Sequence, residues 1–203
     1  YKRQILCEQV TSSGFIWLFE KLISLFTRSP YVHCAFVLKD PTYIHSSLKG
    51  YYIWESSWEG IPDPQDSKVK FGVQITNILD FLYNYPSKKY VRRFTGPDDT
   101  FTPRKIDEIH KKVYDKPYDI MPQDWIEGIL QVDPQPQKTS RFWCSAFVSY
   151  VLVQLKLLPT ILDWSIVRPC DLSAHSTKQS TTLPLYETEI PLLPDMVYKK
   201  HNP

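Results

Sequence analysis

Glycine is scarce in this sequence, with only 6 residues among 203. Neither GxGxxG nor GxxxxGK followed by Ser or Thr occurs, so the glycine-rich loops that hold nucleotide phosphates are excluded. A charge excess of one sign is also lacking, because 24 Lys and Arg stand against 22 Asp and Glu and give a formal net charge of +2. Dedicated nucleic-acid-binding proteins usually carry a strong basic excess, so a nucleic-acid partner is not favoured.

Cysteine spacing typical of metal or redox motifs is missing as well. The four cysteines are Cys7, Cys34, Cys144 and Cys170. No two of them form a CxxC, and they are too sparse for a disulfide scaffold. We therefore expect a reducing compartment and a cytoplasmic location. The histidines other than His33 show no ligand spacing with one another, so neither a metal nor another cofactor is predicted.

Long apolar runs are absent too. The longest stretches, at 15–19 and 146–155, fall short of the roughly 20 residues that cross a bilayer, so no transmembrane segment is predicted. Proline and aromatic residues, in contrast, are plentiful, with 17 Pro, 10 Phe, 13 Tyr and 6 Trp. Together with 42% hydrophobic residues, this composition indicates a folded domain with a substantial core.

The hydrophobic pattern predicts an α+β domain with an antiparallel sheet packed against helices. Helices are expected from Ser12 or Ser13 to about Phe26, around 76–83, after the N-cap Thr102 with Pro103 in the first turn, and at Cys144–Leu155, with its apolar residues on one face. Loops are expected at 59–68 and 131–139. The expected strands lie at 3–9, 32–38, 51–55, 69–75 and 90–94.

The sequence divides into a domain over residues 1–175 and a proline-rich extended arm over residues 176–203. The arm has no clear period and contains four prolines, Pro184, Pro191, Pro194 and Pro203. We expect it to wrap its own domain or to reach a protein partner.

Cys144 is the first candidate for chemistry because it opens an apolar helix. The positive end of a helix dipole favours the thiolate, and the free backbone N–H groups there can bind an oxyanion. A buried structural cysteine is the alternative. Cys34 is expected to be a core residue, because it points to the opposite face of its strand from His33.

Two further residues could complete a catalytic set with Cys144. His33 opens a hydrophobic strand and could act as a general base, or it could be a strand-edge histidine bonded to the backbone. Glu55, on the next strand, could accept the second ring N–H of that histidine, with Glu59 as a rival and a surface position as the alternative. The basic run Lys88–Arg93 could touch phosphate, but a solvated strand edge is the simpler interpretation.

Seven segments, taken in order, resemble the circularly permuted branch of the NlpC-type papain-like superfamily. This branch includes YiiX-like proteins and relatives of lecithin retinol acyltransferase, with members from poxviruses and other large DNA viruses. In it the histidine precedes the cysteine helix along the chain. The segments are 29–33 (SPYVH), 53–56 (IWES), 71–75 (FGVQI), 90–94 (YVRRF), 116–119 (KPYD), 142–148 (FWCSAFV) and 168–172 (RPCDL). The sequence departs from the family at Ala146, where an acidic residue is usual.

The resemblance implies a permuted papain-like fold and a cysteine hydrolase or acyltransferase. Cys144 would attack an amide or ester carbonyl of a peptide or lipid, with His33 as base, Glu55 as its orienting residue, and a thioester intermediate. Tyr31 and Tyr118 would line the site, and no cofactor would be needed. If the protein is viral, its location would be the host cytoplasm or the virion. A structural or virion-associated protein that assembles through the arm is the second interpretation, and a nucleic-acid-binding module is the third.

Overall fold

A computed structural model of the chain describes residues 4–9, 21, 24–25, 28–84, 87–119 and 139–198. The helix expected up to about Phe26 and the polar loop expected at 131–139 fall almost wholly outside the described residues. Within them, no helix is long and apolar enough to cross a membrane.

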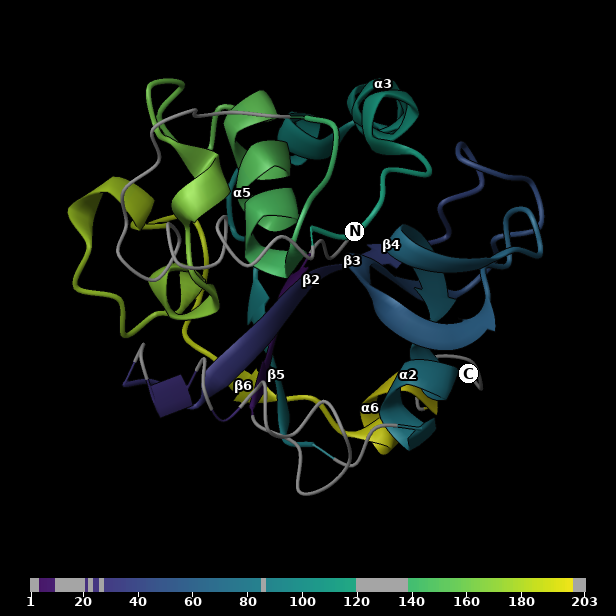
Figure 1. The fold of residues 1–203 in the computed structure, drawn as a ribbon, viewed down its shortest axis with the longest axis horizontal. Helices are drawn as coiled ribbons and strands as arrows, with labels where there is room; N and C mark the ends of the chain where they lie inside the picture. The colour runs from purple at the N-terminus through teal and green to yellow at the C-terminus, as the bar shows by residue number, and fades with distance from the viewer. Residues whose placement is uncertain are drawn as a thin grey trace.

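A six-stranded antiparallel sheet in the order β4-β3-β2-β1-β5-β6 forms the centre of the fold (Figure 1). The α+β class and the antiparallel sheet predicted from the sequence are therefore confirmed. All five predicted strands are present, and a short sixth strand comes from the C-terminal segment. The strands are β1 (Gln4–Gln9), β2 (Tyr31–Lys39), β3 (Tyr51–Pro62), β4 (Val69–Asn77), β5 (Lys89–Arg93) and β6 (Ile190–Pro191).

The β3–β4 hairpin is longer than the sequence pattern predicts. The loop expected at 59–68 begins only after Pro62, because β3 continues to that residue. The register with β4 shifts between Trp58 and Pro62, and Gly60 there adopts a positive φ of 67°. Such an irregularity interrupts the alternation of apolar and polar side chains, which hides the end of the strand from a pattern-based prediction.

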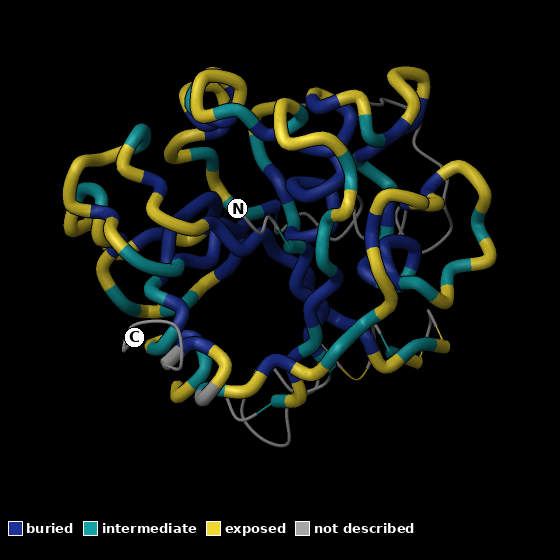
Figure 2. Tube along the Cα trace, turned by 180° about the vertical axis from the view of Figure 1, so that it is seen from behind, coloured by how far each residue is buried: buried dark blue, intermediate teal, exposed yellow. Residues whose placement is uncertain are grey.

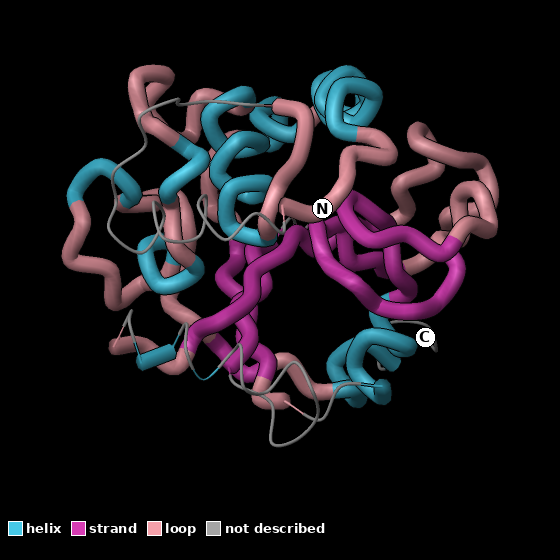
Figure 3. Tube along the Cα trace, in the orientation of Figure 1, coloured by secondary structure: helices cyan, strands magenta, loops and turns pink. Residues whose placement is uncertain are grey.

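Helices cover both faces of the sheet. Those described are α2 (Ile78–Asn84), α3 (Pro103–Val113), α5 (Cys144–Gln154) and α6 (Pro194–Tyr198). Figure 3 shows α5 and α3 on one side of the strands and α2 and α6 on the other. The predicted start of α3 is confirmed, because the Thr102 side chain accepts a hydrogen bond from the backbone N–H of Lys105 and Pro103 follows it.

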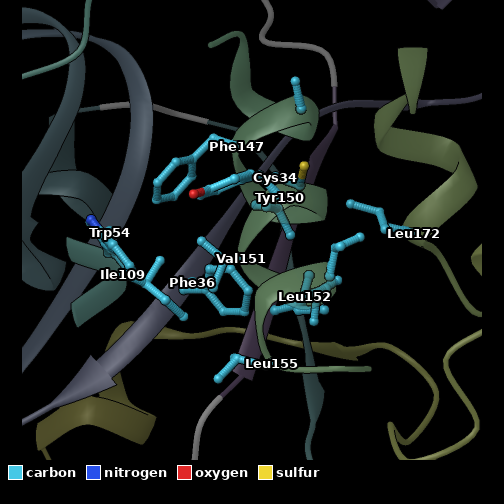
Figure 4. Close-up of a cluster of buried hydrophobic side chains, with 14 of the residues drawn as sticks. Cys34, Phe36, Trp54, Ile109, Phe147, Tyr150, Val151, Leu152, Leu155 and Leu172 are labelled. Carbon is cyan, nitrogen blue, oxygen red and sulfur yellow. The ribbon is translucent and has the colours of Figure 1, made fainter. Parts of the chain in front are cut away.

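The helix α5 is buried on all sides, and the prediction of a single apolar face was wrong. Every residue of α5 except Gln154 is buried. The sheet covers one side, and the segment after the helix, which includes the turn Trp164–Ile166, covers another. Figure 4 shows side chains of β2, β3 and α3 gathered around this helix, including Phe36, Trp54 and Ile109. A helix that is apolar around its whole circumference is typical of a central position.

The described part of the C-terminal segment lies on its own domain. β6 pairs with β5, and Tyr186 forms a bridge with Phe94. The Arg92 guanidinium, which is only 4% exposed, donates to the carbonyl oxygens of Leu172 at 2.6 Å and Glu187 at 2.9 Å. Residues 176–198 of the arm therefore lie against their own domain, as the first of the two expected possibilities states.

The solvated strand edge predicted for Lys88–Arg93 was wrong for two of its four basic residues. Lys89 and Arg92 are buried, because β5 lies between β1 and β6 and the C-terminal segment covers it. Figure 2 shows the buried strands at the centre of the molecule and the exposed loops at its rim.

Candidate active site

A β-bulge in β2 sets the direction of His33. Glu8 of β1 pairs with His33 and the next residue, Gln9, pairs with Tyr31, so Val32 is the extra residue. Tyr31 consequently belongs to the core cluster that contains α5, whereas the His33 ring lies on the α2 side, 6.5 Å from the Phe81 ring. The sulfur of Cys144 lies 3.9 Å from the carbonyl oxygen of Val32.

The start of α5 lies where the pairing between β2 and β3 ends. β2 and β3 pair from Lys39 and Tyr51 as far as Phe36 and Trp54. Beyond Trp54, β3 instead contacts the segment that leads into α5. Ser56 Oγ donates to the carbonyl oxygen of Phe142 at 2.7 Å, two residues before Cys144. This arrangement lets a helix on one face of the sheet bring its first residue to a histidine that points toward the other face.

Cys144 begins α5 and is buried, with 6% of its surface exposed. Trp143 occupies the N-cap position and provides no side-chain hydrogen bond to the first turn. The N-terminal N–H groups of α5 therefore keep the partial positive charge that favours a thiolate or an oxyanion beside Cys144.

His33 connects the cysteine with a buried carboxylate. Its Nε2 lies 2.7 Å from Oε2 of Glu55, which is fully buried, and its ring also hydrogen-bonds the Cys144 thiol. The other carboxylate oxygen of Glu55 accepts a hydrogen bond from Thr76 Oγ1 at 3.3 Å. Since Nε2 faces Glu55, Nδ1 is the nitrogen left for the sulfur. The three residues that the sequence singled out thus lie in one hydrogen-bonded line.

The electrostatics of this line favour a thiolate–imidazolium pair. Burial opposes the imidazolium, but the hydrogen bonds to Cys144 and Glu55 outweigh it and hold the pKa of His33 well above its usual range. A hydrogen bond from Cys34, followed by the bond and charge of His33, overcomes burial and holds the pKa of Cys144 well below its usual range.

Cys34 takes part in the site in a way that the sequence did not predict. It is fully buried in the core, as expected, but its thiol also hydrogen-bonds the sulfur of Cys144. Burial and this bond raise the pKa of Cys34 well above its usual range, so Cys34 stays a thiol and donates to the thiolate. No sequence signal reveals this contact, because it depends on the bulge at Val32 and on the packing of α5.

The two tyrosines expected to line the site take different positions. The Tyr118 hydroxyl accepts a hydrogen bond from the backbone N–H of Cys144, and its ring stacks on Phe71 with centroids 5.1 Å apart. Burial and the nearby Cys144 raise the pKa of Tyr118 well above its usual range, so the phenol is protonated. Tyr31 packs edge-on against Tyr90 in the core, with centroids 6.1 Å apart.

Glu59, the rival of Glu55, lies nearby with different partners. Its Oε1 is 2.6 Å from Ser57 Oγ, which in turn accepts from Gln74 Nε2 at 2.9 Å. Burial and the charge of Glu55 raise the pKa of Glu59 to about 8, so its carboxyl group is largely protonated at neutral pH. Glu55 is therefore the carboxylate that contacts the histidine.

Comparisons with known proteins add no relative: no family model, no curated protein and no solved structure matches the chain. Across the described ranges, no group of three or more His, Cys, Asp or Glu is arranged to hold a metal ion.

Proposed function

We propose that the protein is a cysteine hydrolase or acyltransferase that cleaves an amide or ester bond through a thioester intermediate. The observation that carries this proposal is the line Cys144–His33–Glu55, in which a thiol at a helix N-terminus meets a histidine held 2.7 Å from a buried carboxylate. A nucleophile, a base and an orienting group in hydrogen-bond reach are the requirements of covalent acyl transfer. The antiparallel sheet, the order of these residues and the central cysteine helix also support a permuted papain-like fold.

The first half of the reaction follows from the charges of the pair. The Cys144 thiolate attacks the carbonyl carbon, and the carbonyl oxygen becomes an oxyanion beside the backbone N–H of Cys144. The Tyr118 hydroxyl bonded to that N–H must turn toward the oxyanion or move aside when substrate binds. The imidazolium of His33 then gives its proton to the leaving nitrogen or oxygen, the carbon–heteroatom bond breaks, and a thioester remains.

The second half uses the neutral histidine that the first half leaves. His33 removes a proton from water or an alcohol, whose oxygen attacks the thioester carbonyl. The carbon–sulfur bond breaks, and the thiolate–imidazolium pair is restored. Glu55 keeps the ring oriented throughout and stabilises its positive charge.

The surface beside the site favours a substrate with an apolar group near the scissile bond. Phe71 and Trp58 are 45% and 48% exposed, and their rings meet edge-on with centroids 5.8 Å apart. Through the stack of Phe71 on Tyr118, this aromatic surface continues to the N–H of Cys144. Apolar peptide side chains and lipid chains both suit such a surface.

An activated aryl ester tests the proposal, because a nucleophilic thiol captures its acyl group. We expect one acyl group on Cys144, detected by mass spectrometry of peptides, followed by its loss to water or an added alcohol. Cys144→Ser and His33→Asn should abolish acylation at neutral pH, whereas the matched control Cys170→Ser should acylate at the wild-type rate. Acylation that is distributed over other residues, or that is unchanged in His33→Asn, would overturn the proposal.

The alternative of a structural or virion-associated protein has less support. It relied on the C-terminal arm for assembly, but β6 of this arm pairs with β5, and the carbonyl oxygen of Glu187 accepts a hydrogen bond from Arg92 of the same chain.

A further inference from the structure

Three of the cysteines, Cys7, Cys34 and Cys144, are buried on the two central strands and at the start of α5, and the mechanism uses only Cys144. Cys7 of β1 is directly opposite Cys34 of β2, and the sulfur of Cys144 lies 3.9 Å from the carbonyl oxygen of Val32, two residues before Cys34. All three are free thiols. Figure 4 shows Cys34 at the same end of α5 as Phe147, which is the end that Cys144 begins. Cys34 therefore supplies a second sulfur beside the reactive one.

These two sulfurs differ in chemical character. Cys144 is a thiolate next to His33, and thiolates are the form that peroxides oxidise. Cys34 is a protonated thiol that is fully buried, so it is not a target for oxidants from solution. A reactive thiolate with a second thiol beside it is the arrangement in which a sulfenic acid condenses to a disulfide.

We propose that Cys34 is a resolving cysteine, which converts peroxide-oxidised Cys144 into a reversible Cys34–Cys144 disulfide. This inference rests on the proposed function only in that the blocked sulfur is the nucleophile. The consequence is that a peroxide switches the site off without destroying it, because the disulfide prevents further oxidation of Cys144 to the sulfinic acid.

The chemistry needs one peroxide and no other reagent. The Cys144 thiolate attacks a peroxide oxygen, the O–O bond breaks, and the hydroxide released takes the proton of the His33 imidazolium to become water. Neutral His33 then takes the proton of Cys34, whose sulfur attacks the sulfenic sulfur of Cys144. The S–O bond breaks as the S–S bond forms, and the departing hydroxide receives that proton. Two thiols have lost two electrons, and one peroxide has become two waters.

Mass spectrometry of the full chain after treatment with one equivalent of hydrogen peroxide tests this inference. The wild-type protein should lose the mass of two hydrogen atoms, yield a linked peptide pair containing Cys34 and Cys144, and regain both thiols with a dithiol reductant. Cys34→Ser should instead gain oxygen on Cys144, and most of that gain should resist the reductant. Cys7→Ser is the matched control and should form the disulfide as the wild type does.

Each other outcome has a clear meaning. A Cys7–Cys34 link, or sulfinic acid on Cys144 in both wild type and Cys34→Ser, would overturn the resolving role while leaving the aryl ester result intact. A reversible Cys34–Cys144 disulfide in a protein that captures no acyl group would support the resolving role and contradict the proposed function. Because the wild-type linkage map is informative by itself, the test does not depend on the folding of a variant.

Discussion

Two histidines in different regions of the molecule, one half-buried and one buried, have opposite properties. His33, at the end of β2, contacts a buried carboxylate and a thiol, and its pKa lies well above its usual range. His110, in α3, donates from Nε2 to the amide oxygen Oε1 of Gln65 at 2.9 Å and packs beside the Trp54 ring. Burial, which dominates there, lowers the pKa of His110 to about 4. The comparison shows how strongly the partners of a histidine with little exposure decide whether it carries charge.

The largest expected difference between the two regions is in activity. His33→Asn should lower the acylation rate of Cys144 by about a hundredfold to ten-thousandfold, since it removes both the proton donor and the stabiliser of the thiolate. The matched substitution His110→Asn should leave acylation near the wild-type rate. Acylation kinetics of both variants, with circular dichroism to check folding, measure this contrast. Equal losses in the two variants would remove the distinction between the regions.

The carboxylate partner can be removed without changing the size of the side chain. Glu55→Gln should lower the acylation rate by about a hundredfold or more, because the ring loses its orientation and its positive charge is no longer stabilised. The lower limb of the pH–rate profile should also move, which a purely structural role for Glu55 does not predict. A profile identical in shape to that of the wild type would show that Glu55 acts on stability alone.

The C-terminal segment should depend on one buried cation. Arg92→Met should reduce the free energy of unfolding by about 2–3 kcal/mol, because buried carbonyl oxygens of the 172–187 segment lose their donor. Arg104, which is exposed on α3, provides the control Arg104→Met, for which we expect a change within about 0.5 kcal/mol. Urea denaturation measures both changes, and similar values for the two variants would contradict the stabilising role assigned to the hydrogen bonds of Arg92.

The pH dependence of stability should separate the histidines, because their pKa values shift in opposite directions. His110 has a folded pKa near 4, below its unfolded value of about 6.5, so the unfolded state binds the proton first and stability falls as the pH drops through this window. The loss should reach about 2 kcal/mol between pH 6.5 and pH 5 and should be missing in His110→Gln. His33 has a raised folded pKa, so its contribution is complete below about pH 6.5 and is lost only as the pH rises through that folded pKa. Urea titrations at several pH values would contradict this account if His110→Gln lost as much stability as the wild type between pH 6.5 and pH 5.

Much of the frame could be predicted from local patterns. The alternation in the central strands and the Thr102–Pro103 start of α3 are local signals, and the structure follows them. The end of β3 could not be predicted, because the register shift after Trp58 breaks the alternation on which strand prediction depends. The burial of Arg92 could not be predicted either, because charged residues usually lie in solvent. Its carbonyl partners come from a distant part of the chain.

Local sequence patterns could predict the residues of the candidate site but not how they come together. Cys144, His33 and Glu55 could be named from residue type, from their order and from the start of an apolar helix. Their meeting depends on the bulge at Val32 and on the short β2–β3 ladder, which are properties of the assembled sheet. The position of Cys34 beside Cys144 depends on the same bulge and on the packing of α5, and strand alternation alone assigned Cys34 to the core.

The pH dependence of alkylation tests the central claim, a thiolate–imidazolium pair at Cys144 and His33, most directly. Iodoacetamide reacts with thiolates, so the labelling rate of Cys144, followed by peptide mass spectrometry, reports its charge state at each pH. We predict rapid labelling at pH 6 in the wild type and in Cys170→Ser, and in His33→Asn a rate that falls toward that of an ordinary thiol. Labelling of wild-type Cys144 at pH 6 that is no faster than that of a free thiol, together with an unchanged rate in His33→Asn, would contradict the account.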